Sequence, residues 1–241
     1  MTQPDSAQTP WYMAGDPWRL TETARDPDRT VYFETVFSQA NGYMGVRAYN
    51  EEPYATGENY REAYLAGVFS DVDEHATRII GEFPWPVLEM VNLPDIWHTR
   101  IWVDDVEFEP DAGTVEEYER RLDLRTAVLH RRVVWRDTQG RRTRFEFERF
   151  LSAVTPHLAC QRIAVAPLDW QGTVRLEHCM EGDAVTYFRC GDKRQPHLPQ
   201  WHFQGHSVFA RGATGLLTAT THETGHDVAV ASTVTDGETV T

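Results

Sequence analysis

The run RTRFEFE, residues 142–148, alternates between charged and apolar side chains over most of its length. Successive side chains of a β-strand point to opposite faces, so Phe145 and Phe147 share one face while Arg144 and Glu146 share the other. We therefore expect a strand with both phenylalanines inward and with Arg144 and Glu146 facing solvent or a partner surface. The alternation breaks at Arg149-Phe150, which predicts a β-bulge.

The same pattern dominates the rest of the chain. The run 127–136, AVLHRRVVWR, ends at the turn DTQG and pairs with RTRFEFE as a β-hairpin. Residues 115–122, VEEYERRL, fit a helix or a strand, and the strand is favoured because it leads into this hairpin. Further short β-branched runs follow, at residues 157–167, 172–179, 215–221 and 226–233. Many short strands between turn signals predict an all-β sandwich or barrel.

Length and composition set the wider limits. A chain of 241 residues fits one large β domain, which we place at residues 16–241 after a polar, flexible arm at residues 1–15. The net charge of −14 repels phosphate backbones and anionic lipid, so we expect neither nucleic acid nor membrane as a partner. The sequence shows no export signal and no apolar span, which predicts a cytoplasmic protein.

Two histidine motifs resemble zinc sites. HETGH, residues 222–226, matches H-E-x-x-H, and HFQGH, residues 202–206, repeats its histidine spacing. Both motifs carry a glycine where a helix is needed, and HETGH lies between two strand-like runs, so we expect a hairpin turn and no metal. The three cysteines lack a CxxC pair, and motifs for a nucleophilic serine, a phosphate loop or a dinucleotide are absent, so no cofactor is expected.

Residues 34–52, ETVFSQANGYMGVRAYNEE, contain the strongest turn signal. Asn41-Gly42 favours a tight hairpin because both residues tolerate positive φ. The flanks at residues 34–37 and 43–46 are then expected to pair as strands. The far end of this hairpin carries Arg47 and two carboxylates.

Glu51 and Glu52 are the candidates for acid chemistry, because glycosidic cleavage needs a carboxylic acid. Adjacent strand residues point to opposite faces, however, so we expect one carboxylate in solvent while the other holds a loop or pairs with Arg47. A structural role is favoured over catalysis, and we name no catalytic residue. Asn41, Arg47, Glu51 and Glu52 are instead predicted to form a polar surface at a domain interface or near a substrate mouth.

The same stretch resembles the N-terminal region of glycoside hydrolase family 65, which includes maltose, trehalose and kojibiose phosphorylases and acid trehalases. Later blocks resemble that region in the same order, at residues 64–69, 90–96, 122–152 and 156–172. Ala48 replaces the family's usual glycine. The resemblance implies a large twisted antiparallel β-sandwich that precedes an (α/α)6 barrel. It also implies that this sandwich lacks the barrel and is truncated at its C-terminal end.

The resemblance further implies a function. The family's catalytic acid and phosphate-binding residues belong to the barrel, so this chain is expected to be a non-catalytic domain, inactive alone, of an enzyme that cleaves α-glucosidic disaccharides. Inverting phosphorolysis with inorganic phosphate as co-substrate is expected, and trehalase-like hydrolysis is the alternative. The partners that the resemblance implies are the missing barrel and a second copy of the chain in a homodimer. A stand-alone carbohydrate-binding or interaction module is the other alternative, supported by Trp85, Trp97 and Trp201 if their rings are exposed.

Overall fold

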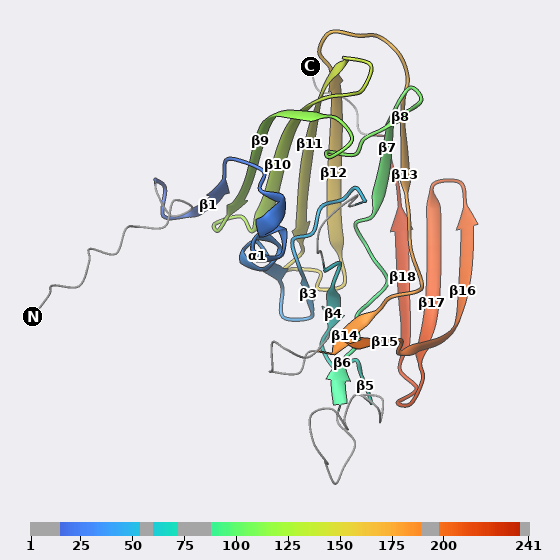
Figure 1. Ribbon diagram of the computed structural model, residues 1–241. Helices are drawn as coiled ribbons and strands as arrows, with labels where there is room; N and C mark the ends of the chain where they lie inside the picture. The colour runs from blue at the N-terminus through green and yellow to red at the C-terminus, as the bar shows by residue number, and fades with distance from the viewer. Residues whose placement is uncertain (1–14, 54–59, 72–87, 189–197, 237–241) are drawn as a thin grey trace, which may run out of the picture. The chain divides into compact units, whose positions relative to one another are not determined.

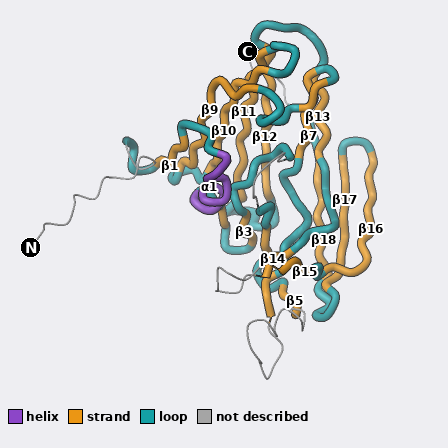
Figure 2. The backbone as a smooth tube through the Cα atoms, in the orientation of Figure 1, coloured by secondary structure: helices purple, strands orange, loops and turns teal. Residues whose placement is uncertain are grey.

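The computed structural model describes residues 15–53, 60–71, 88–188 and 198–236 (Figure 1). In this part of the chain nearly all regular structure is β, as Figure 2 shows, and the one α-helix is α1, Thr30–Val36, preceded by the 3-10 turn η2, Pro27–Arg29. The predicted all-β antiparallel class is therefore confirmed. Internal contacts divide the chain into two compact units, with residues 1–41, 47–60 and 100–176 in the first and residues 42–46, 61–99 and 177–241 in the second.

The first unit contains a five-stranded antiparallel sheet in the order β1-β9-β10-β11-β12. Its strands are β1 (Arg19–Glu22), β9 (Thr114–Asp123), β10 (Val128–Arg136), β11 (Arg142–Leu151) and β12 (Ala159–Pro167). β10 and β11 form the predicted hairpin, and β9 confirms the strand favoured at residues 115–122. The five strands run side by side in Figure 1.

The inner face of this sheet packs on a second layer, from β7 (Thr99–Val103) and β8 (Val106–Glu107). Phe145 and Phe147 are 0% and 1% exposed, whereas the Arg144 and Glu146 side chains are 38% and 45% exposed. The predicted facing is therefore confirmed. Phe145 stacks on Phe108 with ring centroids 4.0 Å apart. The layers are joined by a largely aromatic core of Ile101, Val103, Phe108, Val133, Trp135, Phe145 and Phe147.

The bulge predicted at Arg149-Phe150 is wrong. β11 keeps an unbroken register through Leu151, with Arg149 paired to Leu129 on one side and Gln161 on the other. Arg149 is simply the next inward residue after Phe147, and it is 2% exposed. The charge does not end the strand because a carboxylate meets it inside the protein. The register shift in this sheet lies between β9 and β10 instead, at Val134/Trp135.

The strand predicted at residues 34–37 is also wrong. Residues 34–36 complete α1 and Phe37 caps it. Phe33 and Phe37 lie one helical turn apart, their rings stack at 5.9 Å, and both are buried in a cluster with Ala48, Leu122 and Leu129. This apolar helical face outweighs the strand propensity. The turn itself is present: Gly42 has φ +88° and lies between β2 (Gln39–Ala40) and β3 (Met44–Val46).

The second unit contains small antiparallel sheets. β3 pairs with β4 (Ala63–Leu65), β5 (Phe69–Asp71) with β6 (Leu88–Met90), and β14 (Thr186–Phe188) with β15 (Leu198–Gln200). β16 (Phe203–Arg211), β17 (Thr214–Thr221) and β18 (Asp227–Thr233) form a three-stranded sheet. The remaining strand, β13 (Val174–His178), begins in the first unit, which extends to Leu176, and pairs there with β7.

The histidine motifs lie in this three-stranded sheet. HETGH forms the β17–β18 connection, with Gly225 at φ +67°, so the predicted hairpin turn is confirmed. HFQGH runs into β16, where the register shifts around Gly205. Among the described residues, no group of three or more His, Cys, Asp or Glu side chains is placed to hold a metal ion. None of the helices in this part of the chain is long and apolar enough to span a bilayer.

Candidate functional site

Three buried arginines stand on the inner face of the five-stranded sheet, one on each of three neighbouring strands. Arg120 lies on β9, Arg131 on β10 and Arg149 on β11, and each is at most 4% exposed. Arg120 and Arg131 are directly opposite each other in the sheet register. Three cations so close together and out of water require carboxylates nearby, because an unpaired buried charge is very costly.

Arg131 binds both candidate carboxylates. Its Nη1 donates to Glu52 Oε1 at 2.6 Å, and its Nη2 donates to Glu51 Oε2 at 2.7 Å and also contacts Glu52 Oε2. The guanidinium lies 4.1 Å above the ring of Phe147, which supports it from below. One arginine therefore holds two consecutive glutamates against the sheet.

This arrangement corrects the expectation that Glu51 and Glu52 point apart. Both are buried, at 3% and 1% exposure, and neither lies in solvent. Residues 47–52 form no strand and bend at Glu51, so adjacent side chains reach the same partner. Arg47 lies against α1, where its Nη2 donates to Val31 O at 3.1 Å and approaches Glu34 Oε2 at 3.5 Å. Glu51 and Glu52 therefore belong to a buried cluster and not to the predicted polar surface.

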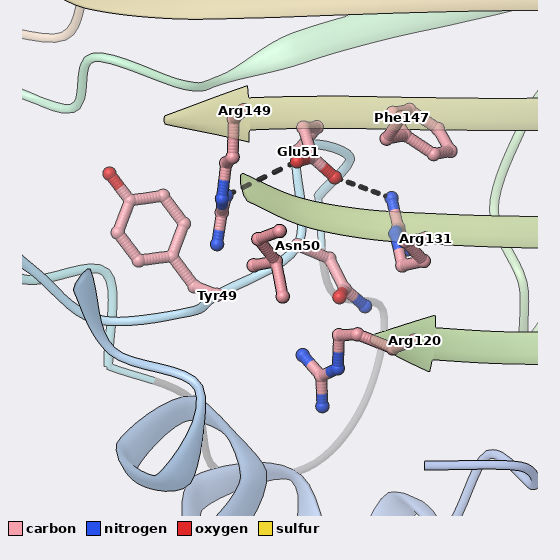
Figure 3. Close-up of a pocket in the computed structure, with 8 residues that line it drawn as sticks. Tyr49, Asn50, Glu51, Arg120, Arg131, Phe147 and Arg149 are labelled. Carbon is pink, nitrogen blue, oxygen red and sulfur yellow. Dashed lines mark hydrogen bonds and ion pairs between the residues drawn. The ribbon is translucent and has the colours of Figure 1, made fainter. Parts of the chain in front are cut away.

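Arg120 and Arg149 complete the attachment of residues 48–52 to the sheet. Arg149 Nη1 donates to Glu51 Oε1 at 3.2 Å, so Glu51 lies between Arg131 and Arg149 (Figure 3). Arg120 Nε donates to Glu22 Oε2 at 2.8 Å, and its Nη1 donates to Ala48 O at 2.9 Å. Residues 48–52 are thus fastened to three strands through six buried charges, which we call the arginine–glutamate cluster: Glu22, Glu51, Glu52, Arg120, Arg131 and Arg149.

The electrostatics of the cluster differ between its carboxylates. Burial acts to raise the pKa of Glu51, but the charges of Arg131 and Arg149 outweigh it and hold that pKa below its ordinary value. At Glu22 burial prevails over Arg120, and the pKa is raised. A general acid needs a raised pKa and access to substrate. Glu51 lacks the raised pKa, and Glu22, which is only 2% exposed, lacks access to substrate.

A small pocket adjoins the cluster. Figure 3 shows the side chains of Arg120, Arg131 and Arg149 around it, with Asn50 near its centre. Its free space is about that of a single water molecule, so it cannot admit a sugar ring. The full lining is Tyr49, Asn50, Glu51, Arg120, Leu129, Arg131, Phe147 and Arg149. The cluster is arranged to hold a chain segment in place and not to enclose a substrate.

Asn41 has a separate structural contact. Its Nδ2 donates to Ser152 O at 2.8 Å and to Pro156 O at 2.9 Å, which ties the turn to the loop after β11. The structure thus brings Glu51 and Glu52 together and places Asn41 and Arg47 on other partners. Their role at a domain interface or a substrate mouth stays a prediction.

Sequence reasoning overlooked the arginines. Arg131 lies two residues before the inward-facing Val133, and Arg149 lies two residues after the inward-facing Phe147, so strand parity alone places both inside. The three tryptophans named for a carbohydrate-binding module differ in exposure. Trp97 is 2% exposed and belongs to a core, Trp201 is 64% exposed, and Trp85 lies outside the described residues.

Comparison with known proteins gives the family. Residues 20–240 match the model described as "Glycosyl hydrolase family 65, N-terminal domain". A kojibiose phosphorylase from Halothermothrix orenii is 34% identical over 73% of this chain and 22% of its own length. An alpha,alpha-trehalose phosphorylase from Thermoanaerobacter brockii is 28% identical over 69% of this chain and 22% of its own length.

Two further matches cover almost the whole chain. An uncharacterized glycosyl hydrolase from Mycobacterium tuberculosis is 28% identical over 93% of this chain and 17% of its own length. A solved structure from the human microbiome, provisionally named kojibiose phosphorylase, shares the fold with a TM-score of 0.71 at 19% identity, over 91% of this chain and 30% of that one. The chain thus spans less than a third of each of these relatives. It belongs to glycosyl hydrolase family 65, of which it carries the N-terminal domain.

Proposed function

We propose that this chain is the non-catalytic N-terminal domain of an enzyme that cleaves α-glucosidic disaccharides by inverting phosphorolysis. The observation that carries the proposal is the match to the family's N-terminal domain model, together with the similarity to about a fifth of the length of relatives named kojibiose phosphorylase and alpha,alpha-trehalose phosphorylase. Such cleavage breaks the bond between the anomeric carbon and the leaving oxygen. Phosphate attacks that carbon from the opposite side, and a carboxylic acid protonates the leaving oxygen.

The buried carboxylates support a non-catalytic role. The acid in this reaction must be protonated beforehand, whereas Glu51 is held ionised by Arg131 and Arg149. Glu52 is 1% exposed, and both oxygens of its carboxylate contact Arg131. The adjoining pocket has room for a water molecule only. The acid and the phosphate site are therefore assigned to a further domain, an (α/α)6 barrel as the family resemblance implies.

The domain's own contribution is a rigid surface. The arginine–glutamate cluster fixes residues 48–52 on the sheet, and the aromatic core fixes the sheet on its second layer. A platform of this kind can orient a neighbouring catalytic domain without touching the reacting atoms. Asn41 and Arg47, which are only partly buried in this unit, remain our candidates for contact with that domain.

The test compares this chain with the longest reading frame that contains it. Both proteins are incubated with kojibiose, trehalose, maltose and nigerose, with and without phosphate, and glucose and glucose 1-phosphate are quantified. We expect no turnover from the 241-residue chain. We expect phosphate-dependent β-glucose 1-phosphate from the longer protein, because inversion converts the α-linkage to the β-anomer. Phosphate-independent glucose release would favour hydrolysis, and turnover by the short chain would overturn the proposal.

A second candidate is a stand-alone carbohydrate-binding module. The exposed indole of Trp201 favours it, since flat aromatic rings stack on sugar faces, whereas the buried Trp97 weighs against it. A titration of this chain with the same disaccharides, followed by tryptophan fluorescence, separates the candidates. Saturable binding that disappears in Trp201→Ala would favour the module, and an unchanged signal at millimolar sugar would favour the non-catalytic domain.

A further inference from the structure

Two histidines meet where the end of β13 lies beside the start of β7. His178 ends β13, and His98 directly precedes β7. The backbone N–H of Cys179 donates to His98 O at 2.9 Å, which joins the two segments. Both histidines and Cys179 belong to the second unit, which the chain re-enters after Leu176. The junction therefore lies at the start of residues 179–185, which lead from β13 to β14.

Each histidine reaches across the junction to the opposite segment. His178 Nδ1 lies 3.4 Å from Thr99 Oγ1. The Thr99 hydroxyl donates to Trp97 O at 3.2 Å, so its oxygen is the acceptor toward His178 and the imidazole is the donor. In the other direction, His98 Nδ1 lies 2.8 Å from Glu181 Oε1. Two side-chain contacts thus flank the backbone hydrogen bond.

The carboxylate that faces His178, that of Asp95, already has partners. Its Oδ1 accepts two backbone N–H groups of the following bend, at 2.8 and 3.2 Å. Its Oδ2 lies 2.5 Å from Arg61 Nε, which balances its charge. The Glu181 carboxylate contacts His98, and its side chain is 63% exposed. A proton on His178 therefore adds a positive charge beside His98 at a place where both described carboxylates of the junction are engaged.

The pKa of the His178 imidazole reflects these surroundings. Burial lowers this pKa below its ordinary value of about 6.5. The Asp95 charge opposes the shift, the His98 ring adds to it, and a hydrogen bond to the His98 backbone opposes it, with a lowered pKa as the result. An opened segment thus binds a proton more readily than a closed one. The closed form is fully stable above about pH 6.5 and loses stability as pH falls from there through the folded pKa.

We propose that residues 98–99 and 178–181 form a pH-sensitive latch, which is closed while His178 is neutral and opens when its ring takes up a proton. In the closed form the ring donates one hydrogen bond to Thr99. In the open form water solvates the imidazolium, and its repulsion from His98 is relieved. Opening is thus driven by the uptake of one proton and reverses when that proton is lost.

The latch opens locally because Asn92 holds the far end of the segment. The backbone N–H of Asn92 donates to Thr186 Oγ1 at 2.8 Å, and its Nδ2 donates to Val185 O at 3.0 Å. Neither contact involves a titratable side chain. We therefore expect residues 178–184 to be released in acid while β14 stays in place.

Hydrogen exchange of the Cys179 amide, followed by NMR, reports the state of the latch. After correction for the intrinsic exchange rate, its protection should fall by roughly threefold or more between about pH 7.5 and about pH 5.5, with a limit of about tenfold per pH unit for one proton. His178→Gln retains a side-chain donor but takes up no proton, so its protection should not change with pH. The matched control is His157→Gln, at an exposed histidine after β11, which should follow wild type.

The ring itself provides a second readout. The Cε1–H resonance of His178, assigned by its loss in His178→Gln, should titrate with a midpoint below about 6.5, and protection of Cys179 should level off below that midpoint. Amides of β10 and β11 should stay protected, which distinguishes local opening from global unfolding. A midpoint at or above about 6.5, Cys179 protection that is independent of pH, a pH dependence that persists in His178→Gln, or an equal loss in β10 and β11 would overturn the proposal.

Discussion

The inner face of the five-stranded sheet has two contrasting ends. Toward one end of β10 and β11, Val133, Trp135 and Phe145 form an apolar core. Arg131 lies on the same face of β10, two residues from Val133. Arg149 lies on the same face of β11, two residues from Phe147, and both arginines are buried. Strand periodicity thus specifies which side chains point inward, while burial of a charge depends on a distant segment that brings its partner.

The two ends are stabilised by different forces. Each apolar side chain gains from removal from water, at roughly 25 cal/mol per Å². At the charged end, the Coulomb attraction between Arg131 and its glutamates is set against the desolvation of every charged group, so the intact cluster contributes little net stability. Removal of a single member is nevertheless severe, because it leaves a buried charge without its partner.

The largest expected effect comes from Arg131→Met. Loss of this guanidinium leaves Glu51 and Glu52 buried without their shared partner. We expect the free energy of unfolding to fall by about 3–5 kcal/mol, measured by urea denaturation. A loss below about 1 kcal/mol would show that the cluster is open to water, and the contrast between the two ends would disappear.

Val133→Ala probes the apolar end of the same strand. Val133 is 1% exposed and lies on the same face as Arg131, two residues away. Removal of two methyl groups should cost about 2 kcal/mol, with an unchanged denaturant slope. A loss of unfolding free energy larger than that of Arg131→Met would contradict the expectation that the charged end is more sensitive to a single substitution than the apolar end.

Acid titration separates the carboxylates. The pKa of Glu51 is lower in the folded protein than in the unfolded chain, so its contribution is present above the unfolded value of about 4.3 and is lost as pH falls through the folded value. Glu51→Gln should therefore flatten the loss of stability on the acid side. The raised pKa of Glu22 acts in the opposite sense, so Glu22→Gln should steepen that loss. The measurement is urea denaturation across the acid range, and equal slopes in all three proteins would contradict the assignment.

The smallest effect is expected at Arg132, the immediate neighbour of Arg131 on the outer face. Its side chain is 51% exposed and pairs with Glu117 at 3.1 Å. Because exposed ion pairs contribute little, Arg132→Met should change the free energy of unfolding by less than about 1 kcal/mol. This variant is the matched control for Arg131→Met. Equal losses of unfolding free energy at both positions would contradict the placement of Arg131 on the inner face and Arg132 on the outer face.

The sequence predicted the facing of the sheet well. Period-two alternation placed Phe145 and Phe147 inward, and Gly225 with its β-branched flanks placed HETGH on a turn. These features are local, so a short window of sequence contains them. The helical residues Phe33 and Phe37 were missed because their apolar spacing competes with a nearby turn signal.

The cluster could not be predicted in the same way. Arg131 and Glu52 are 79 residues apart, and no local pattern connects them. Strand geometry also gave the wrong answer for Glu51 and Glu52, because the backbone leaves the extended conformation there. A buried charge whose partner lies far along the chain looks, in a local window, like an exposed residue or an interruption of the strand.

The most direct test of the structural role of the cluster is a double-mutant cycle between Arg131 and Glu52. The free energy of unfolding is measured for wild type, Arg131→Met, Glu52→Gln and the double variant. We predict that each single change costs several kcal/mol and that the double change costs no more than the worse single one, since removal of both partners leaves fewer unpaired buried charges. If the loss of unfolding free energy in the double variant equals the sum of the losses in the two single variants, the claim that Arg131 and Glu52 stabilise each other inside the protein is contradicted.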